Sequence, residues 1–231
     1  MKLAGINFPE PLLAALRNDG LVIFAGSGVS MGAPAYLPDF GTLADQIAKG
    51  TSESRPKLET EDRFLGRLHQ NGVNIYDRAA DELKKNGVAF TELHRNLLRL
   101  FPSSEQVRIV TTNFDLLFEH AAKDVFNEVP EVFRAPALPL GKHFCGIVHL
   151  HGAVSHPHEM VLTDADFGRA YLIEGWACRF LLDLFLHYTV LFVGYSHNDT
   201  IVSYLARALP ESEKGMRFAL VQEANDSQHW N

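Results

Sequence analysis

Cysteine is scarce in this chain: Cys145 and Cys178 are the only two among 231 residues. Two cysteines are too few for a disulfide framework or a four-cysteine zinc site, and this low usage fits a reducing compartment. Hydrophobic residues make up 46% of the sequence, enough for a sizeable core. We therefore expect a compact cytoplasmic protein without disulfide bonds.

An excess of positive charge and long apolar runs are also lacking. Lys and Arg total 21 against 28 Asp and Glu, and the net charge of -7 disfavours direct nucleic-acid binding by this domain. The stretch LLDLFLHYTVLFVG is interrupted by Asp183 and His187 and is shorter than the roughly 20 residues that a bilayer requires. The N-terminus has no basic and apolar signal pattern. We expect neither a membrane segment nor export.

Short apolar runs alternate with helical patterns along the chain. The apolar runs are typical of buried parallel strands and cover residues 21–25, 107–111, 146–150, 190–193 and 218–221. Apolar residues at helical spacing cover residues 58–69, 76–85, 91–100, 114–125, 176–187 and 200–209. This alternation predicts an α/β fold with a doubly wound, mostly parallel, Rossmann-like sheet.

The domain organisation follows from where strands are missing. Residues 50–100 contain helical patterns and no strand, so we expect a helical insertion beside the sheet within one domain over residues 1–231. Only QEANDSQHWN follows the last predicted strand, which leaves no helix to cover the sheet edge. We therefore expect this chain to be the N-terminal part of a longer protein that continues past Asn231.

A glycine-rich segment, Ala25-Gly-Ser-Gly-Val-Ser30, follows the first predicted strand. Ligands of open α/β sheets bind at the carboxyl ends of the strands, where glycines let a phosphate approach and a following helix N-terminus favours its charge. The glycines could equally serve only the turn. Their positions at 26, 28 and 32 do not match the spacing of hydride-transferring dehydrogenases, and the P-loop pattern is absent.

Polar segments also follow three later strands. In Thr111-Thr-Asn-Phe-Asp115, Asn113 offers a donor and an acceptor and Asp115 an acceptor, although either could simply cap the next helix. In His149-Leu-His-Gly152, His151 is either a general base or a histidine held by backbone partners. The segment Gly194-Tyr-Ser-His-Asn-Asp199 could grip phosphate or ribose.

Taken in order, the motifs A-G-x-G-x-S, T-x-N-x-D, L-H-G and F-V-G-x-S-x-x-D resemble those of the sirtuin family over residues 20–222. The resemblance is to its bacterial branch whose members hydrolyse NAD, many of them in anti-phage defence. It implies a catalytic pair, Asn113 and His151, and a cavity that binds NAD. The residues that the resemblance assigns to NAD binding are Ala25, Gly26, Ser27, Gly28, Ser30, Asp39, Phe40, Thr112, Asp115, Gly194, Ser196 and Asp199.

Departures from the deacylases of this family change the expected reaction. Gly41 and Thr112 stand where deacylases usually carry arginine and glutamine, and the paired C-x-x-C motifs of their zinc module are absent. We therefore expect that the site holds no metal. Water is the expected acceptor, and nicotinamide and ADP-ribose are the expected products. Family analogy further implies control through a homo-oligomer, a C-terminal regulatory domain or a partner protein.

Three other functions stay open. An acyl-lysine could be the acceptor, as in NAD-dependent deacylases. The domain could instead bind NAD or ADP-ribose as a non-catalytic sensor. A metal-dependent hydrolase is the third, because an H-x-H pair on one strand face can bind zinc and four histidines lie within ten residues: His149, His151, His156 and His158.

Overall fold

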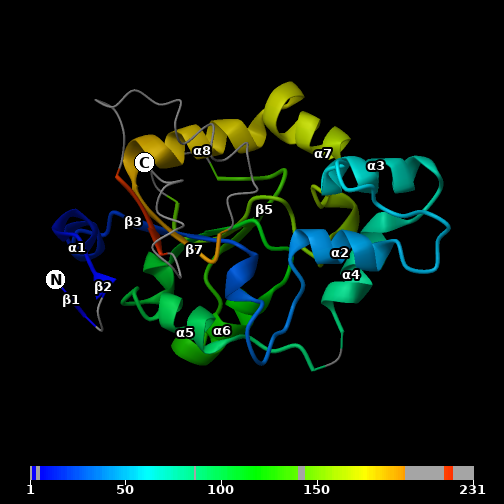
Figure 1. Ribbon diagram of the computed structural model, residues 1–231. Helices are drawn as coiled ribbons and strands as arrows, with labels where there is room; N and C mark the ends of the chain where they lie inside the picture. Colours follow the sequence, from blue (N-terminus) through cyan, green and yellow to red (C-terminus); the bar gives the residue numbers. More distant parts are fainter. Residues whose placement is uncertain (1, 4–5, 86, 140–143, 196–215, 221–231) are drawn as a thin grey trace.

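The fold is built on a six-stranded sheet in which every neighbouring pair is parallel. The computed structural model describes residues 2–3, 6–85, 87–139, 144–195 and 216–220 (Figure 1). The strand order is β5-β6-β4-β3-β7-β8, so the predicted Rossmann-like α/β class is confirmed. The strands are β3 (Leu21–Ala25), β4 (Arg108–Thr111), β5 (Val132–Arg134), β6 (Gly146–His149), β7 (Thr189–Val193) and β8 (Arg217–Leu220).

Five of these strands occupy the apolar runs predicted from the sequence. The strand β5 was not predicted, because it has three half-buried residues, VFR, and so lacks a long apolar run. The strand β4 pairs with one side of β3, and β7, which comes later in the chain, pairs with the other side. Ligands of such sheets bind at this reversal of strand order.

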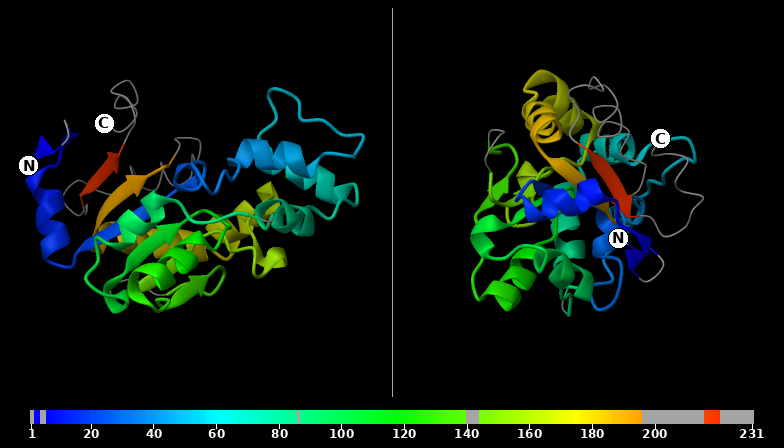
Figure 2. Two further views of the ribbon diagram at one scale, coloured as in Figure 1. Left: turned by 90° about the horizontal axis from the view of Figure 1, so that it is seen from below. Right: turned by 90° about the vertical axis from the view of Figure 1, so that its left-hand side faces the viewer.

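Helices cover both faces of the sheet (Figures 1 and 2). Alternate residues of β3 belong to two different apolar clusters: Val22 and Phe24 pack with α8 (Trp176–His187), and Leu21 and Ile23 pack with the helices of the opposite face. That second layer consists of α1 (Glu10–Arg17), α5 (Glu92–Leu98) and α6 (Leu117–Phe126). The period of two is what a strand buried on both sides requires.

A lobe of three helices projects from one end of the sheet (Figure 2, left). It consists of α2 (Phe40–Ile47), α3 (Glu61–Gln70) and α4 (Ile75–Leu83), whose shared core includes Leu43, Phe64 and Ile75. The expected insertion covered residues 50–100. The lobe instead begins earlier, with α2, while α5 packs against α6 in the sheet layer.

Several short elements complete the described structure. They are β1 (Lys2–Leu3), β2 (Ile6–Asn7), α7 (Asp164–Gly168), the π-helix η5 (Arg169–Ile173) and the 3-10 turns η1 (Ser27–Val29), η2 (Ser104–Gln106) and η4 (Pro157–Glu159). The predicted helix over residues 200–209 lies outside the described residues. Within the described ranges, no helix has the length and apolar character needed to cross a bilayer.

Candidate active site

The register of the sheet brings the predicted functional segments to one edge. Ala25 pairs with Thr111 and Val193, and Thr111 pairs with His149, so four strands end at the same level. A cavity of about 620 Å³ is lined by the residues that follow these strand ends and by residues of the helical lobe. The predicted site residues in its lining are Gly26, Ser27, Ser30, Asp39, Phe40, Thr112, Asn113, Asp115 and His151.

The glycine-rich loop packs tightly against the loop after β7. The Gly28 amide donates to the Gly194 carbonyl at 2.8 Å, and a Cβ on Gly26 would lie 2.6 Å from that same oxygen. Gly194 itself has φ +60, a conformation that favours glycine. Glycine at position 26 is therefore required by the close approach of the Gly194 backbone. Gly28, in the same loop as Gly26, also contacts Gly194.

The glycine-rich loop does not lead into an α-helix, which corrects the sequence-based prediction of a helix N-terminus behind the phosphate. It leads into the three-residue turn η1, and the next α-helix begins at Phe40. Pro34 and Pro38 in the intervening segment disfavour helix. Any phosphate at this loop would therefore be bound without the dipole of a long helix.

Asn113 is tied into the cavity wall by its side-chain amide. Its Nδ2 donates to the Gly26 carbonyl and to Ser30 Oγ, at 3.2 Å each. Asn113 does not cap α6, whose N-cap is Leu116. Both amide protons are used, so Oδ1 is the atom of this side chain that can accept a further hydrogen bond.

Ser30 connects three polar side chains within the cavity wall. Its hydroxyl donates to Asp115 Oδ2 at 2.9 Å and accepts from Asn113. His94 Nε2 lies 3.3 Å from the same oxygen. The Thr91 amide donates to His94 Nδ1, which leaves the ring proton on Nε2 to be donated to Ser30.

Burial sets the charge states around Ser30. Burial lowers the pKa of His94 to about 4, so this ring is neutral at pH 7. Burial also raises the pKa of Asp115, against the opposing hydrogen bonds from Leu117 N–H and Ser30. Asp115 precedes the N-cap Leu116, and its Oδ1 accepts from the amide of Leu117, the first residue of α6, at 3.0 Å. It therefore supports the start of this helix without being its N-cap, and this does not exclude a second role. His94 was not found from the sequence; its only signal is the Thr91-x-x-His94 pattern at a helix start.

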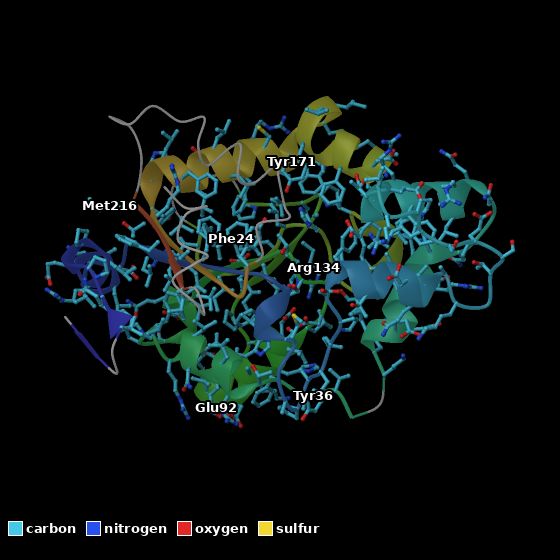
Figure 3. All side chains as sticks on the ribbon, in the orientation of Figure 1. Phe24, Tyr36, Glu92, Arg134, Tyr171 and Met216 are labelled. Atoms are coloured by element: carbon cyan, nitrogen blue, oxygen red, sulfur yellow. The ribbon has the colours of Figure 1, made fainter. Side chains whose placement is uncertain are left out.

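His151 lies two residues beyond β6 and faces the cavity. Its Nε2 lies 2.8 Å from the Tyr171 hydroxyl, and the Phe167 ring meets it edge-on at 5.2 Å. Phe167 and Tyr171 are stacked on each other. Tyr171 comes from the π-helix between α7 and α8 (Figure 3), an irregularity that is frequent at functional sites and has no period that a sequence pattern reveals.

The lobe contributes charged side chains to the cavity. Asp39 is the N-cap of α2, and hydrogen bonds from Thr42 lower the pKa of its carboxyl group. Arg55, which the sequence did not single out, lines the cavity and is paired with Glu61 at 2.7 Å. Its guanidinium lies 3.7 Å from where a Cβ on Gly41 would be. A cation therefore lies beside Gly41 although position 41 has no side chain.

Five predicted site residues remain. Ala25 lies fully buried at the end of β3, and its carbonyl accepts from the Thr112 amide. Gly28 and Gly194 shape the loop contact described above. Ser196 and Asp199 lie outside the described residues.

The histidines that suggested a metal site do not form a cluster. They have four different partners, which are Glu119, Tyr171, Ser155 and Asp77 for His149, His151, His156 and His158 respectively. In the part of the chain that the structure describes, no three His, Cys, Asp or Glu side chains are placed to hold a metal ion.

The fold and the cavity define an α/β protein with a polar site at the carboxyl ends of its strands. The profile of the SIR2-like domain matches residues 107–230, more than half of the chain. The chain belongs to the SIR2-like domain family, which confirms the resemblance to sirtuins.

Two curated relatives cover nearly the whole chain. An uncharacterized protein, y4cA, of Sinorhizobium fredii (strain NBRC 101917 / NGR234) is 37% identical over 89% of this chain and 19% of its own length. The NAD(+) hydrolase ThsA of Bacillus cereus (strain MSX-D12) is 25% identical over 94% of this chain and 46% of its own length. The chain thus spans less than half the length of either relative.

Proposed function

We propose that this chain cleaves the bond between nicotinamide and ribose in NAD, with water as the acceptor and nicotinamide and ADP-ribose as products. The observation that carries the proposal is the convergence of Asn113, Asp115 and His151 on one cavity at the reversal of strand order. The similarity to an NAD(+) hydrolase supports the choice of substrate.

The chemistry needs a site that holds both the leaving group and the water. Loss of nicotinamide leaves an oxocarbenium-like ribose, as in glycoside hydrolysis. The C–N bond breaks with its electron pair passing to the nicotinamide ring, a C–O bond forms to water, and the water gives up one proton. His151 receives that proton, or the proton of a ribose hydroxyl, as general base.

Asn113 and Asp115 have positioning roles in this mechanism. Because both protons of the Asn113 amide are held by Gly26 and Ser30, its Oδ1 accepts a hydrogen bond from the ribose or the attacking water. Asp115 keeps lone pairs beyond its bonds to Ser30 and Leu117, and these accept from the carboxamide of nicotinamide. The glycine-rich loop, with Ser27 in the cavity lining, lies beside the pyrophosphate.

The test is nicotinamide release by the chain and by two variants. His151→Ala is expected to lower NAD cleavage by roughly 100- to 10,000-fold, the usual contribution of a general base. His156→Ala is the matched control, because this exposed histidine contacts Ser155 outside the cavity lining. Full activity of His151→Ala would remove this residue from the mechanism. Binding of NAD without nicotinamide release would favour a sensor, and loss of acyl groups from a peptide would favour a deacylase.

We also propose that NAD cleavage by this protein depletes the cofactor during anti-phage defence. The resemblance to the defence branch of the family supports this role. Unrestrained cleavage would harm the host, so a further domain, a partner protein or assembly into a homo-oligomer controls the activity. Bacteria that express the protein, but not those that express His151→Ala, should lose NAD and form fewer plaques on infection; equal plaque numbers would contradict the role in defence.

A further inference from the structure

A buried network of charged side chains lies behind the cavity wall. His149 is fully buried at the end of β6, and its Nε2 lies 3.0 Å from Glu119 Oε1 on α6. Glu119 is in turn 3.6 Å from the guanidinium of Arg134, on the neighbouring strand β5. Neither His149 nor Glu119 is part of the cavity lining, so the proposed mechanism uses neither of them.

The second ring nitrogen of His149 contacts the backbone of Asn113. Its Nδ1 lies 3.2 Å from the backbone carbonyl oxygen of Asn113. A carbonyl oxygen can only accept, and the carboxylate on the other side of the ring also accepts, so both nitrogens must carry protons for both bonds to form. The geometry therefore selects the imidazolium form of His149.

The charges around His149 favour the same form. Burial alone lowers the pKa of His149, but the hydrogen bond and charge of Glu119, together with the Asn113 carbonyl and Asp115, raise it above its ordinary value. Burial likewise raises the pKa of Glu119, while His149 and Arg134 lower it below its ordinary value overall. A charged pair of this kind is costly to bury, and removing one partner leaves the other unpaired.

We propose that His149 is a positioning residue for the reaction: its imidazolium, held by Glu119, fixes the Asn113 backbone and thereby the Asn113 side chain in the cavity. This inference rests on the proposed function, because Asn113 is the residue that it positions. The side-chain amide of Asn113 already bridges Gly26 and Ser30, so a shift of its backbone would move the Oδ1 acceptor relative to the ribose. A displacement of about 1 Å can cost about 100-fold in rate.

Two substitutions separate the two bonds of the ring. His149→Gln places an amide donor at the position of Nε2, so it keeps the bond to Glu119 and loses the bond to Asn113. His149→Asn places the donor at the position of Nδ1 and keeps the bond to Asn113. His149→Asn is combined with Glu119→Gln, because His149→Asn alone would leave the buried Glu119 carboxylate unpaired. Glu119→Gln alone is the control for this double variant.

The kinetic result expected is a loss in kcat that depends on which bond is removed. His149→Gln should lower kcat by about 10- to 100-fold with little change in KM, while His149→Asn/Glu119→Gln should stay within about threefold of the parent. An equal loss in both variants, or no loss in His149→Gln, would overturn the inference. Thermal melting checks that each variant is folded, and His187→Gln, at an exposed position near the end of α8, is the surface control.

A spectroscopic measurement keeps the inference separate from the proposed function. In protein labelled with ¹⁵N-histidine at pH 7.5, a ring with protons on both nitrogens should be observed, and this signal should be missing in His149→Gln. The Asn113 side-chain amide resonances should shift in His149→Gln and remain in place in His149→Asn/Glu119→Gln. A neutral His149 ring or unmoved Asn113 resonances would overturn the inference even in a protein without NAD turnover, whereas absent turnover alone would refute only the proposed function.

Discussion

The pH dependence of stability should show the effect of the buried histidine behind Ser30. Burial lowers the pKa of His94 from 6.5 to about 4. Between pH 7 and pH 5 the unfolded chain takes up a proton at this position that the folded chain does not. A histidine whose pKa is lowered by folding contributes stability that is lost as the pH falls through this range, here about 2 kcal/mol.

His94→Gln isolates this contribution. Glutamine does not titrate, and it is a preferred residue at the third position of a capping box that begins with threonine, here Thr91. The free energy of unfolding, measured by urea denaturation at both pH values, should fall by about 2 kcal/mol more in the parent than in His94→Gln. The comparison cancels every other titrating group. His120→Gln, at an exposed position of α6, should follow the parent.

A constant difference between parent and His94→Gln at pH 7 and pH 5 would refute the reasoning. It would mean that His94 is protonated in the folded protein, which would place a second proton on Nδ1 against the Thr91 amide. The contact between His94 Nδ1 and Thr91 would then have to be reassigned, with Nδ1 donating to the Thr91 hydroxyl oxygen 2.8 Å away.

Three further substitutions test the cavity wall. Tyr171→Phe removes the hydroxyl bonded to His151 and should lower NAD cleavage about 10-fold in steady-state assays, with a melting temperature reduced by only about 2–4 °C. Ser30→Ala removes a hydrogen bond to the buried carboxylate of Asp115 and should destabilise the fold by about 2 kcal/mol in urea denaturation. Because burial raises the pKa of Asp115, its carboxylate takes up a proton at a higher pH than an exposed aspartate does, and that loss should become smaller as the pH is lowered. Gly194→Ala puts a Cβ 2.6 Å from the Val29 amide at a positive φ and should cost about 3 kcal/mol or more in the same denaturation assay.

Each of these three expectations has a result that would contradict it. Gly50→Ala introduces the same kind of positive φ, at +79, with no atom within 4 Å of the new Cβ. It should cost only about 1 kcal/mol, so an equal cost at position 194 would argue against the contact between the two loops. Unchanged turnover in Tyr171→Phe would show that the hydroxyl has no part in orienting His151. A loss in Ser30→Ala that does not become smaller as the pH is lowered would contradict the raised pKa of Asp115.

The sheet could be predicted from the sequence because its strands are buried on both faces. Residues 21–25 and 190–193 are continuous apolar runs, which parallel strands between two helix layers require. The strand β5 escaped prediction because an edge strand of three half-buried residues has no such run. The helix α2 was not predicted either, although Leu43, Ala44 and Ile47 have helical spacing and Asp39 is a residue typical of an N-cap.

The residues that line the candidate site could be predicted from motifs, whereas the residues that support them could not. Asn113, Asp115 and His151 each come within a few residues of a strand end, so the shared edge of a parallel sheet brings them together. Tyr171 and His94 reach the site from helices that are distant in sequence, and only tertiary packing reveals their contacts. Contacts of this kind leave no fixed spacing in the sequence.

Cleavage of NAD in water enriched in ¹⁸O tests the central claim most directly. The account predicts that the protein releases nicotinamide and ADP-ribose in equal amounts, and that mass spectrometry finds one ¹⁸O atom in each ADP-ribose. The anomeric hydroxyl of free ADP-ribose also exchanges with water, so unlabelled ADP-ribose incubated in the same water gives the background that is subtracted. Nicotinamide release with unlabelled or cyclised ADP-ribose would contradict water as the acceptor, and the absence of nicotinamide would contradict NAD cleavage itself.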